Sequence, residues 1–484
     1  MASIINALVI ATMFGGQAAA TKYYVDCSQS SPGSGTQASP WNSVSQVNQP
    51  TFQPGDIIAF KSGTTCTGTL SPKGAGTASS VIQITKYSTD CNTANPVING
   101  NGATAAVTLT NQDYWYMSDL SVTNPASTLA ARQGIHVTAN DGKTHTGITI
   151  DSNYVDKVAG QTNKKTSSAD FSRSSCILVD ATGTGSRYDS VLVKGNNVSN
   201  CGGGGIKVRV GAMDNHGQQT RVTNNTIDAC GGDGIIISHS ESPLIDYNIA
   251  SNLGKGTYPW TGGNFAGMWV LGDHNPTISH NVVYGSIMSD IDSEAFDCDW
   301  GNTGNCTIEY NYSHDNAGGA FLNCDGCGPS GGATQIVRYN IFQNDCRMYS
   351  NGDNSKLHFY QNVMYCADKN FDISVPKNTQ FTNNIFVGNS NSILPARSGI
   401  KWSWNVFQNV QRPTRNGISG NAGFVDPGTG GNTLDSVGGY RLTKSSPALL
   451  NGAIIASNGG QDYYGNLVST TTKPNRGAYN GPGI

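Results

Sequence analysis

The chain has 484 residues, among them 60 Gly and 49 Asn. Only 13% of its residues are charged, about half the usual share of roughly 25%, which argues against disorder driven by charge. A long helical bundle is also disfavoured, because Gly and Asn are poor helix formers. The formal net charge of -3 gives no field that would favour nucleic acid or an anionic membrane surface as a partner.

Residues 1–20 have the pattern of a secretory signal peptide. An apolar stretch from Ile4 to Phe14 is followed by small residues, although no Lys or Arg precedes it. No later run is long and apolar enough to span a membrane. The 12 cysteines form an even set, as is usual where disulfides form. We therefore expect a secreted, extracellular protein with disulfide bonds.

A short repeat runs along the middle of the chain: an apolar residue is followed three positions later by Asn, mostly at intervals of 21 to 33 residues. The repeated positions are Asn153, Asn196, Asn225, Asn248, Asn281, Asn311, Asn340, Asn362, Asn384 and Asn405. A unit this short, with β-rich stretches and no helical stripe, must stack on its neighbours to bury its apolar face. We therefore predict an all-β, right-handed parallel β-helix. Asn suits its repeated corner, because Asn tolerates the left-handed conformation and can bond to the Asn stacked above it.

The two ends of the chain differ from the repeat. Residues 21–125 contain strand-like runs, at 57–61, 81–86, 106–109 and 114–124, as expected of an N-terminal cap and the first coils. Residues 126–423 carry the coils and the predicted cleft. Residues 424–484 are expected to form a C-terminal cap over the open sheet edge of the last coil. No linker is apparent, so we predict a single solenoid domain.

The most unusual run is Asp290-Ile-Asp-Ser-Glu-Ala-Phe-Asp-Cys-Asp-Trp300, which has five carboxylates and lies where the repeat intervals are long. Insertions in solenoids cluster on the working face. Strand alternation places Phe296 and Cys298 in the core, and therefore Asp297 and Asp299 on the outer face.

The next coil repeats part of this phrase as Leu322-Asn-Cys-Asp325, 26 residues later. This spacing predicts that Asp325 stacks beside Asp299 on the outside and that Asn323 lies next to Asp297. It also places Cys324 beneath Cys298, so these two cysteines could form a disulfide or stay as inward stacked thiols, and the same two alternatives apply to Cys346 and Cys366.

Paired carboxylates are what glycosidic bond cleavage requires: one acid protonates the leaving oxygen, and the other attacks the sugar or activates water. Asp297, Asp299 and Asp325 are therefore the predicted catalytic residues. Repulsion between them should raise one pKa. Stacked strands lie about 4.8 Å apart, so Asp299 with Asp325 would suit a retaining enzyme, whereas the diagonal pair Asp297 and Asp325, at about 8 Å, would suit an inverting one.

Several other side chains are predicted to contact a substrate. By the same register Trp269 points outward one coil earlier, and Lys207 and Arg209 do so further back, so that basic, aromatic and acidic residues form one strip. Trp300 and Asn323 flank the acids.

Two further candidates have structural alternatives. His314 is at a corner, where a structural turn competes with substrate contact. Trp260, in an insertion, is either a lid aromatic or part of the loop packing. Asp290, Asp292 and Glu294 suit Ca²⁺ ligands or solvated loop charges better than catalysis.

The chain resembles the secreted right-handed β-helix carbohydrate-active enzymes over nearly all of its length. The segments similar to that superfamily's ends are Tyr23-Tyr-Val-Asp, Pro54-Gly-Asp-Ile-Ile, Ser446-Pro-Ala-Leu, Asp462-Tyr-Tyr-Gly-Asn and Gly477-Ala-Tyr. The phrase Phe296-Asp-Cys-Asp-Trp300 is loosely similar to the acid arrangement of β-helix β-xylosidases, and this resemblance implies Asp299 as nucleophile. The position of that family's acid/base Glu is Asn323 here.

We therefore expect a monomeric glycoside hydrolase that acts on a plant or microbial polysaccharide or oligosaccharide and requires no cofactor. One alternative is a polysaccharide lyase acting on a uronic-acid polymer, with Lys207 or Arg209 as base and Ca²⁺ held by the acidic run. Another is a non-catalytic solenoid that binds cell walls. Neither nucleic acid nor a membrane is an expected partner.

Overall fold

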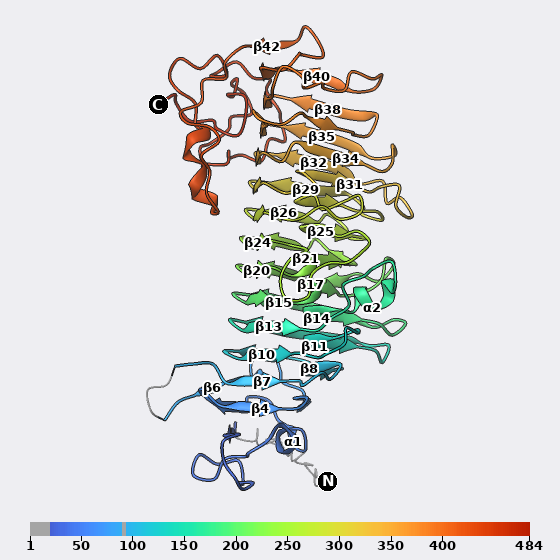
Figure 1. Cartoon of the computed structure of the whole chain (residues 1–484), viewed down its shortest axis with the longest axis vertical. Coiled ribbons are helices and arrows are strands. Elements are labelled where there is room, and N and C mark those ends of the chain that lie inside the picture. Colours follow the sequence, from blue (N-terminus) through green and yellow to red (C-terminus); the bar gives the residue numbers. More distant parts are fainter. Residues whose placement is uncertain (1–19, 90–92) are drawn as a thin grey trace, which may run out of the picture.

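The computed structural model describes residues 20–89 and 93–484 and shows a parallel β-helix (Figure 1). In the central coils, each coil contributes one strand to each of three long sheets, and strands of neighbouring coils pair in parallel. The predicted all-β solenoid is confirmed. The expected signal peptide lies, except for Ala20, outside the described residues. Among the described residues, no helix has the length and hydrophobicity needed to cross a bilayer.

The first sheet runs the full length of the solenoid. Its strands are β1 (Lys22–Val25), β3 (Ile57–Lys61), β6 (Ile82–Tyr87), β9 (Trp115–Ser118), β12 (Thr144–Asp151), β15 (Arg187–Lys194), β19 (Thr220–Thr223), β23 (Leu244–Asp246), β26 (Thr277–Ser279), β29 (Asn305–Glu309), β32 (Thr334–Arg338), β35 (Lys356–Tyr360), β38 (Asn378–Thr382) and β40 (Lys401–Ser403).

The second sheet follows the first after one sharp corner in each coil. Its strands are β4 (Thr65–Thr67), β7 (Val97–Asn99), β10 (Ser121–Asn124), β13 (Tyr154–Val158), β16 (Asn197–Ser199), β20 (Thr226–Asp228), β24 (Ile249–Ser251), β27 (Val282–Tyr284), β30 (Tyr312–His314), β33 (Ile341–Gln343), β36 (Val363–Tyr365), β39 (Ile385–Val387), β41 (Asn405–Gln408) and β42 (Gly417–Ser419).

The third sheet carries the acidic strand and is covered by the longest loops. Its strands are β8 (Ala105–Thr110), β11 (Gln133–Ala139), β14 (Ser175–Ala181), β17 (Gly202–Arg209), β21 (Gly231–Ser238), β25 (Met268–Leu271), β28 (Phe296–Cys298), β31 (Phe321–Asn323), β34 (Arg347–Ser350) and β37 (Asp372–Ile373).

The remaining elements are short. Two small sheets pair β2 (Thr51–Phe52) with β5 (Lys73–Gly74) and β18 (Gly217–Gln218) with β22 (Ser240–Glu241). The helices are α1 (Val44–Val47), α2 (Ser168–Ser172) and the 3-10 helix η1 (Leu434–Tyr440). Helix α2 lies in the loop between β13 and β14, beside the third sheet (Figure 1).

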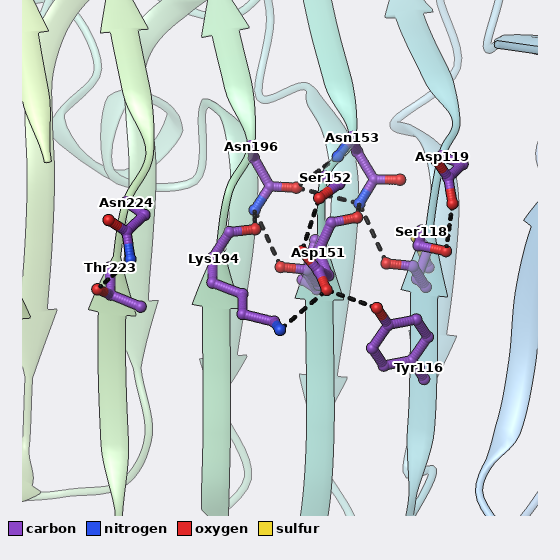
Figure 2. Close-up of polar contacts among 12 residues, drawn as sticks. Tyr116, Ser118, Asp119, Asp151, Ser152, Asn153, Lys194, Asn196, Thr223 and Asn224 are labelled. Atoms are coloured by element: carbon purple, nitrogen blue, oxygen red, sulfur yellow. Dashed lines mark hydrogen bonds and ion pairs between the residues drawn. The ribbon is translucent and has the colours of Figure 1, made fainter. Parts of the chain in front are cut away.

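The repeated asparagines form a buried ladder at the corner between the first and second sheets. In each rung the backbone N–H of one Asn donates to the side-chain oxygen of the Asn in the next coil, from Asn153 to Asn405. Figure 2 shows the first rung, where the side chains of Asn153 and Asn196 lie side by side on adjacent coils. The side-chain amides also donate to backbone carbonyls, so these otherwise unpaired corner groups are satisfied.

We expected the ladder asparagines to adopt the left-handed conformation, but they do not. This conformation falls on the residue before each of them, where φ is between 53° and 58° for Tyr247, His280, Tyr310, Tyr339 and Trp404 among others. A bulky residue at positive φ is uncommon. Stacking offsets part of that strain, because the rings of Tyr247, His280, Tyr310 and Tyr339 follow one another along the solenoid at centroid distances of 4.8 to 5.6 Å.

Five disulfides join cysteines within the described residues: Cys27–Cys66, Cys176–Cys201, Cys298–Cys306, Cys324–Cys327 and Cys346–Cys366. The candidate pair Cys346–Cys366 is confirmed and the candidate pair Cys298–Cys324 is wrong. Cys230 is a buried thiol, and Cys91 lies outside the described residues.

After β42 the chain turns back along the outside of the solenoid (Figure 1). Its apolar side chains, including Tyr440, Leu442 and Tyr479, pack in one cluster with Tyr312 and Ile341 of the second sheet. The segment therefore covers the second sheet of the later coils, in addition to continuing the chain beyond the last coil.

Candidate active site

Strand alternation on β28 is as predicted. Phe296 and Cys298 belong to the apolar core, so the Asp297 side chain emerges on the opposite, outer face of the third sheet. Trp269 is the register partner of Asp297 on the preceding coil and also faces outward. The outer face of this sheet is therefore where the acidic run meets an aromatic side chain.

The predicted alignment of β28 with β31 is wrong by one residue. Phe296 pairs with Phe321, Asp297 with Leu322 and Cys298 with Asn323, an offset of 25 residues where the repeated phrase suggested 26. A slip of one residue exchanges the two faces of a strand. Asn323 consequently points into the solenoid and is not a substrate-binding residue.

The inward position of Asn323 is stabilised by a buried polar network. Its side-chain N–H donates to Ser350 Oγ at 2.8 Å, and its oxygen accepts hydrogen bonds from Gln335 Nε2 and, at 3.3 Å, from Ser355 Oγ. With its hydrogen bonds satisfied, Asn can occupy a core position that the sequence pattern would assign to an apolar residue.

Asp325 lies in the loop after β31 and does not join the acids of β28. Its Oδ1 accepts a hydrogen bond of 2.6 Å from Ser330 Oγ, and only 5% of its surface is exposed. The side-by-side stacking of Asp325 and Asp299 predicted from the sequence is therefore absent from this structure.

Three loops build a wall over the outer face of the third sheet. They precede β14, β25 and β28 and comprise residues 159–174, 252–267 and 285–295. The first two are joined by the backbone hydrogen bond from Lys164 to Gly262 at 2.8 Å. The second and third are joined by that from Asp290 to Gly263 at 3.1 Å. The repeat intervals correctly placed two of these insertions.

The loops and the end of β28 border an open pocket, which we call the acid pocket. The residues lining it are Lys164, Lys165, Gly263, Asn264, Asp290, Ile291, Asp292, Asp299, Trp300, Cys324 and Cys327. A carboxylate oxygen of Asp299 lies within 4.8 Å of both sulfurs of the Cys324–Cys327 disulfide. The pocket thus brings Asp292 and Asp299 to one cavity together with the predicted sugar-contacting Trp300.

Burial makes the carboxyl groups here hold their protons unusually tightly. It raises the pKa of Asp299 to about 7, against the opposing hydrogen bond from the Trp300 backbone N–H and the charge of Lys164. The pKa of Asp292 is also raised by burial, while Lys164 and Arg347 lower it. Asp297 is deepest, and burial followed by the charges of Asp299 and Asp292 raises its pKa well above the usual range.

The predicted calcium ligands are already engaged elsewhere or kept apart. Asp290 forms an ion pair of 2.5 Å with Lys165. Glu294 is fully buried and paired with Arg347, and burial raises its pKa to about 8. Among the described residues, Asp290, Asp292 and Glu294 do not bring three ligand atoms together. Within residues 20–89 and 93–484, the only such group that includes a pocket acid contains Cys324 and Cys327, whose sulfurs are joined in a disulfide.

The basic part of the predicted strip lies on the same face, toward the N-terminus. Lys207 is 5% exposed, pairs with Asp233 at 3.3 Å and donates to the backbone oxygen of Phe171 at 2.9 Å. The indole N–H of Trp269 donates to Asp233 at 3.1 Å. Burial lowers the pKa of Lys207 to about 8, with Asp233 opposing and nearby cations adding to the shift. Arg209 is exposed at the end of β17, the strand that also carries Lys207.

Two predicted contacts line neither the acid pocket nor the neighbouring pocket around Lys207. His314 belongs to the second sheet, where its ring stacks on Tyr284 at 4.8 Å and its Nδ1 lies 2.9 Å from Asp315, so its place is structural. Trp260 packs on the core and against Phe265 at a ring distance of 6.0 Å, which favours the loop-packing alternative.

Sequence reasoning missed the parts played by Asp292, Asp233 and Lys164. The sequence pattern favours a Ca²⁺ ligand or a solvated loop charge for Asp292, yet the loop returns Asp292 to the cavity of Asp299. Asp233 stands among glycines, where no periodicity marks it, and Lys164 lies in a loop without pattern. The usable signal was the length of the insertions, since long loops on one face of a solenoid tend to meet.

Known proteins that are similar to this chain share its parallel β-helix fold. Residues 212–410 match the family described as the right-handed β-helix region. A lacto-N-biosidase of Bifidobacterium longum subsp. longum is 24% identical over 472 residues, covering 77% of this chain and 29% of that protein. The chain thus spans less than a third of the length of this relative.

Two solved structures of the GH136 lacto-N-biosidase from Eubacterium ramulus share the fold. The native protein gives a TM-score of 0.60 at 20% identity, covering 75% of this chain and 68% of that one. The selenomethionine derivative gives 0.62 at 18% identity, covering 83% and 68%. At these identities the likeness establishes the architecture of the solenoid.

Proposed function

We propose that this chain is a secreted glycoside hydrolase that cleaves an oligosaccharide with Asp292 and Asp299. The observation that carries the proposal is the convergence of these two carboxyl groups, each with a raised pKa, on one pocket of the outer wall. The names of the similar proteins, lacto-N-biosidases, support a glycosidic substrate. Five disulfides are in keeping with an oxidising compartment.

Asp299 is assigned as the general acid, in place of the nucleophile role that the resemblance to β-helix β-xylosidases implied. A pKa of about 7 leaves its carboxyl largely protonated up to neutral pH, so that it can protonate the glycosidic oxygen as the bond breaks. Asp292 is the second carboxylate, which attacks the anomeric carbon or activates a water. The positive charges of Lys164 and Arg347 favour its ionised form.

Asp297 acts as a positioning residue beneath this pair. It is 3% exposed, and its Oδ1 has no hydrogen-bond partner among the described residues. Held protonated, its carboxyl adds no second negative charge beside Asp299. Trp300 lines the same pocket and offers an aromatic surface for a sugar ring.

The test compares three variants on a panel of glycosides that includes an aryl lacto-N-bioside and neutral oligosaccharides. We expect D292N and D299N each to lower kcat by about 10²- to 10⁴-fold, the usual contribution of an acid or base catalyst. D325N is the matched control and should retain near-normal turnover, because Asp325 lies outside the pocket. Loss of activity in D325N with normal activity in D292N would reject the assignment.

A polysaccharide lyase is the second candidate, and the observation that favours it is the lowered pKa of Lys207, which brings a potential base close to neutrality. The Asp233 ion pair and the burial of Lys207 oppose that role.

The two reactions are told apart with uronate polymers, with and without a chelator. We expect no unsaturated, ultraviolet-absorbing product and no effect of the chelator, whereas such a product would establish elimination. A protein that binds the panel but forms no product would be a non-catalytic solenoid.

A further inference from the structure

A second pocket lies on the outer face of the third sheet, next to the acid pocket, and we call it the basic pocket. It spans β14, β17, β21 and β25 and shares Lys164 with the acid pocket. Its charged lining residues are Lys164, Arg173, Lys207, Arg209, Asp180 and Asp233. Four cations therefore face two carboxylates in a protein whose formal net charge is -3.

Both carboxylates of the basic pocket are already paired within the protein. Asp180 lies 2.9 Å from Nε2 of His136. Asp233 pairs with Lys207 at 3.3 Å and accepts the indole N–H of Trp269 at 3.1 Å. Asp180 is also the register partner of Arg209 on the adjacent strand, and Arg173 pairs with Asp170 at 3.0 Å, so the excess of cations over carboxylates in the lining rests on Lys164 and Arg209.

Two of the cations keep unpaired charge. Arg209 is exposed, and no hydrogen bond or ion pair of its guanidinium is found within the described residues. The Lys164 amino group donates to the backbone oxygen of Asn264 at 3.1 Å, which supplies no opposite charge. The charges of Lys164 and Arg209 both lower the pKa of Lys207, so each of these two cations lies close enough to repel the charge of Lys207.

The other walls of the pocket are apolar and aromatic. They are formed by Phe171, Leu178, Ile236 and Trp269, which suit the apolar face of a pyranose ring. A cavity with an apolar wall and unneutralised cations is complementary to a sugar that bears a negatively charged substituent.

We propose that the basic pocket is a subsite for an acidic sugar unit, whose carboxylate or sulfate group binds Arg209. The proposal rests on the proposed function in so far as this unit belongs to the glycan that is cleaved. Strand β17 is three coils from β28, about 14 Å at the usual strand spacing. The acidic unit therefore lies some distance along the oligosaccharide from the bond that the acid pocket cleaves.

The test is calorimetric binding of tetragalacturonate, a sulfated galacto-oligosaccharide and neutral galactotetraose to the full chain. We expect the acidic probes to bind at least about tenfold more tightly than the neutral one, the scale of one charge-assisted contact. The preference should disappear at about 1 M salt, where the Debye length falls to about 3 Å. The two acidic probes separate carboxylate from sulfate recognition. Equal binding of all three would overturn the proposal.

A variant pair tests the role of Arg209. R209Q should lose the preference for acidic probes, while R415Q, which removes an equally exposed arginine from the last coils, should keep it. Similar binding by R209Q and R415Q would also overturn the proposal. Calorimetry needs no turnover, so acidic binding without hydrolysis of any glycoside would reject the hydrolase and leave the subsite standing.

Discussion

Burial, more than the number of acidic residues, determines the pKa values of the carboxyl groups on the third sheet. Asp297 and Asp299 are neighbours on one strand end, but loops cover the first and leave the second open to a cavity. Because desolvation penalises the charged form, the pKa of the covered Asp297 is raised well above the usual range and that of Asp299 is raised to about 7. One fold thereby provides a proton donor at a pH where a free aspartate would be ionised.

The activity should consequently depend on pH in a defined direction. Asp299 has a raised pKa of about 7, so its protonated, active form is lost as the pH rises through that value. We expect kcat/KM to fall about tenfold per pH unit above this point. The acidic limb reports ionisation of Asp292 and should lie above the ordinary aspartate range, because burial raises that pKa as well.

The variant K164M provides an internal check on this profile. Lys164 lowers the pKa of Asp299, so removing its charge should move the alkaline limb to higher pH. A pH–rate profile with the limb unmoved in K164M, or with no limb near neutrality in the wild type, would contradict the assignment of Asp299 as the acid.

At the scale of the elements, the coil corner is the most repeated feature of the molecule. Asn281 uses its amide to bond two backbone carbonyls and the next ladder residue, Asn311, and its oxygen accepts from the preceding one, Asn248. Consecutive corners are thus linked through side chains as well as through the sheets. This arrangement is a reason for the regular register of the first and second sheets in the coils flanking the site.

We expect N281A to lower the free energy of unfolding by about 3 kcal/mol. The change leaves the carbonyls of Ile245 and Ser279 and the backbone N–H of Asn248 without their bonds in a buried corner. Denaturant midpoints and hydrogen exchange at the Asn248 amide measure the effect. The control N354A removes an exposed Asn and should change stability by less than about 0.5 kcal/mol. Equal midpoints for the two variants would show that the ladder contributes little.

At the scale of the whole molecule, the solenoid is closed by a segment that folds back on it. Tyr440 is 1% exposed, packs against Tyr365 and Phe424, and donates from its hydroxyl to Gln343 Oε1 at 2.8 Å. Residues far apart in sequence therefore share one apolar cluster on the second sheet. The site, on the third sheet, is left uncovered by this segment.

Y440A should loosen the C-terminal segment and leave the central coils folded. Loss of a large buried aromatic side chain costs about 3 to 5 kcal/mol, and the coils carry their own core. Limited proteolysis should then cleave within residues 424–484 first. Y440F, which removes only the hydroxyl, should cost about 1 kcal/mol and stay resistant. Cleavage of Y440A within the central coils, or at the wild-type rate, would contradict this account.

The solenoid could be derived from the chain alone because its signal is redundant. Ten apolar-to-Asn spacings each predict the same corner of the coil, so a wrong assignment at one of them does not change the predicted fold. Alternation likewise placed Phe296 inside and Asp297 and Trp269 outside, since a strand has only two faces and core residues occupy one of them.

Which residues form the site depended on contacts that do not repeat along the sequence. The phrase shared by the two acidic coils suggested an offset of 26 residues, but the coil has 25, because Asn323 is satisfied inside by Ser350, Gln335 and Ser355 from other coils. Asp325 was thereby lost from the site. Asp292 was gained because three loops from separate coils bond to one another, and loop–loop contacts between residues about 100 positions apart leave no mark on local sequence.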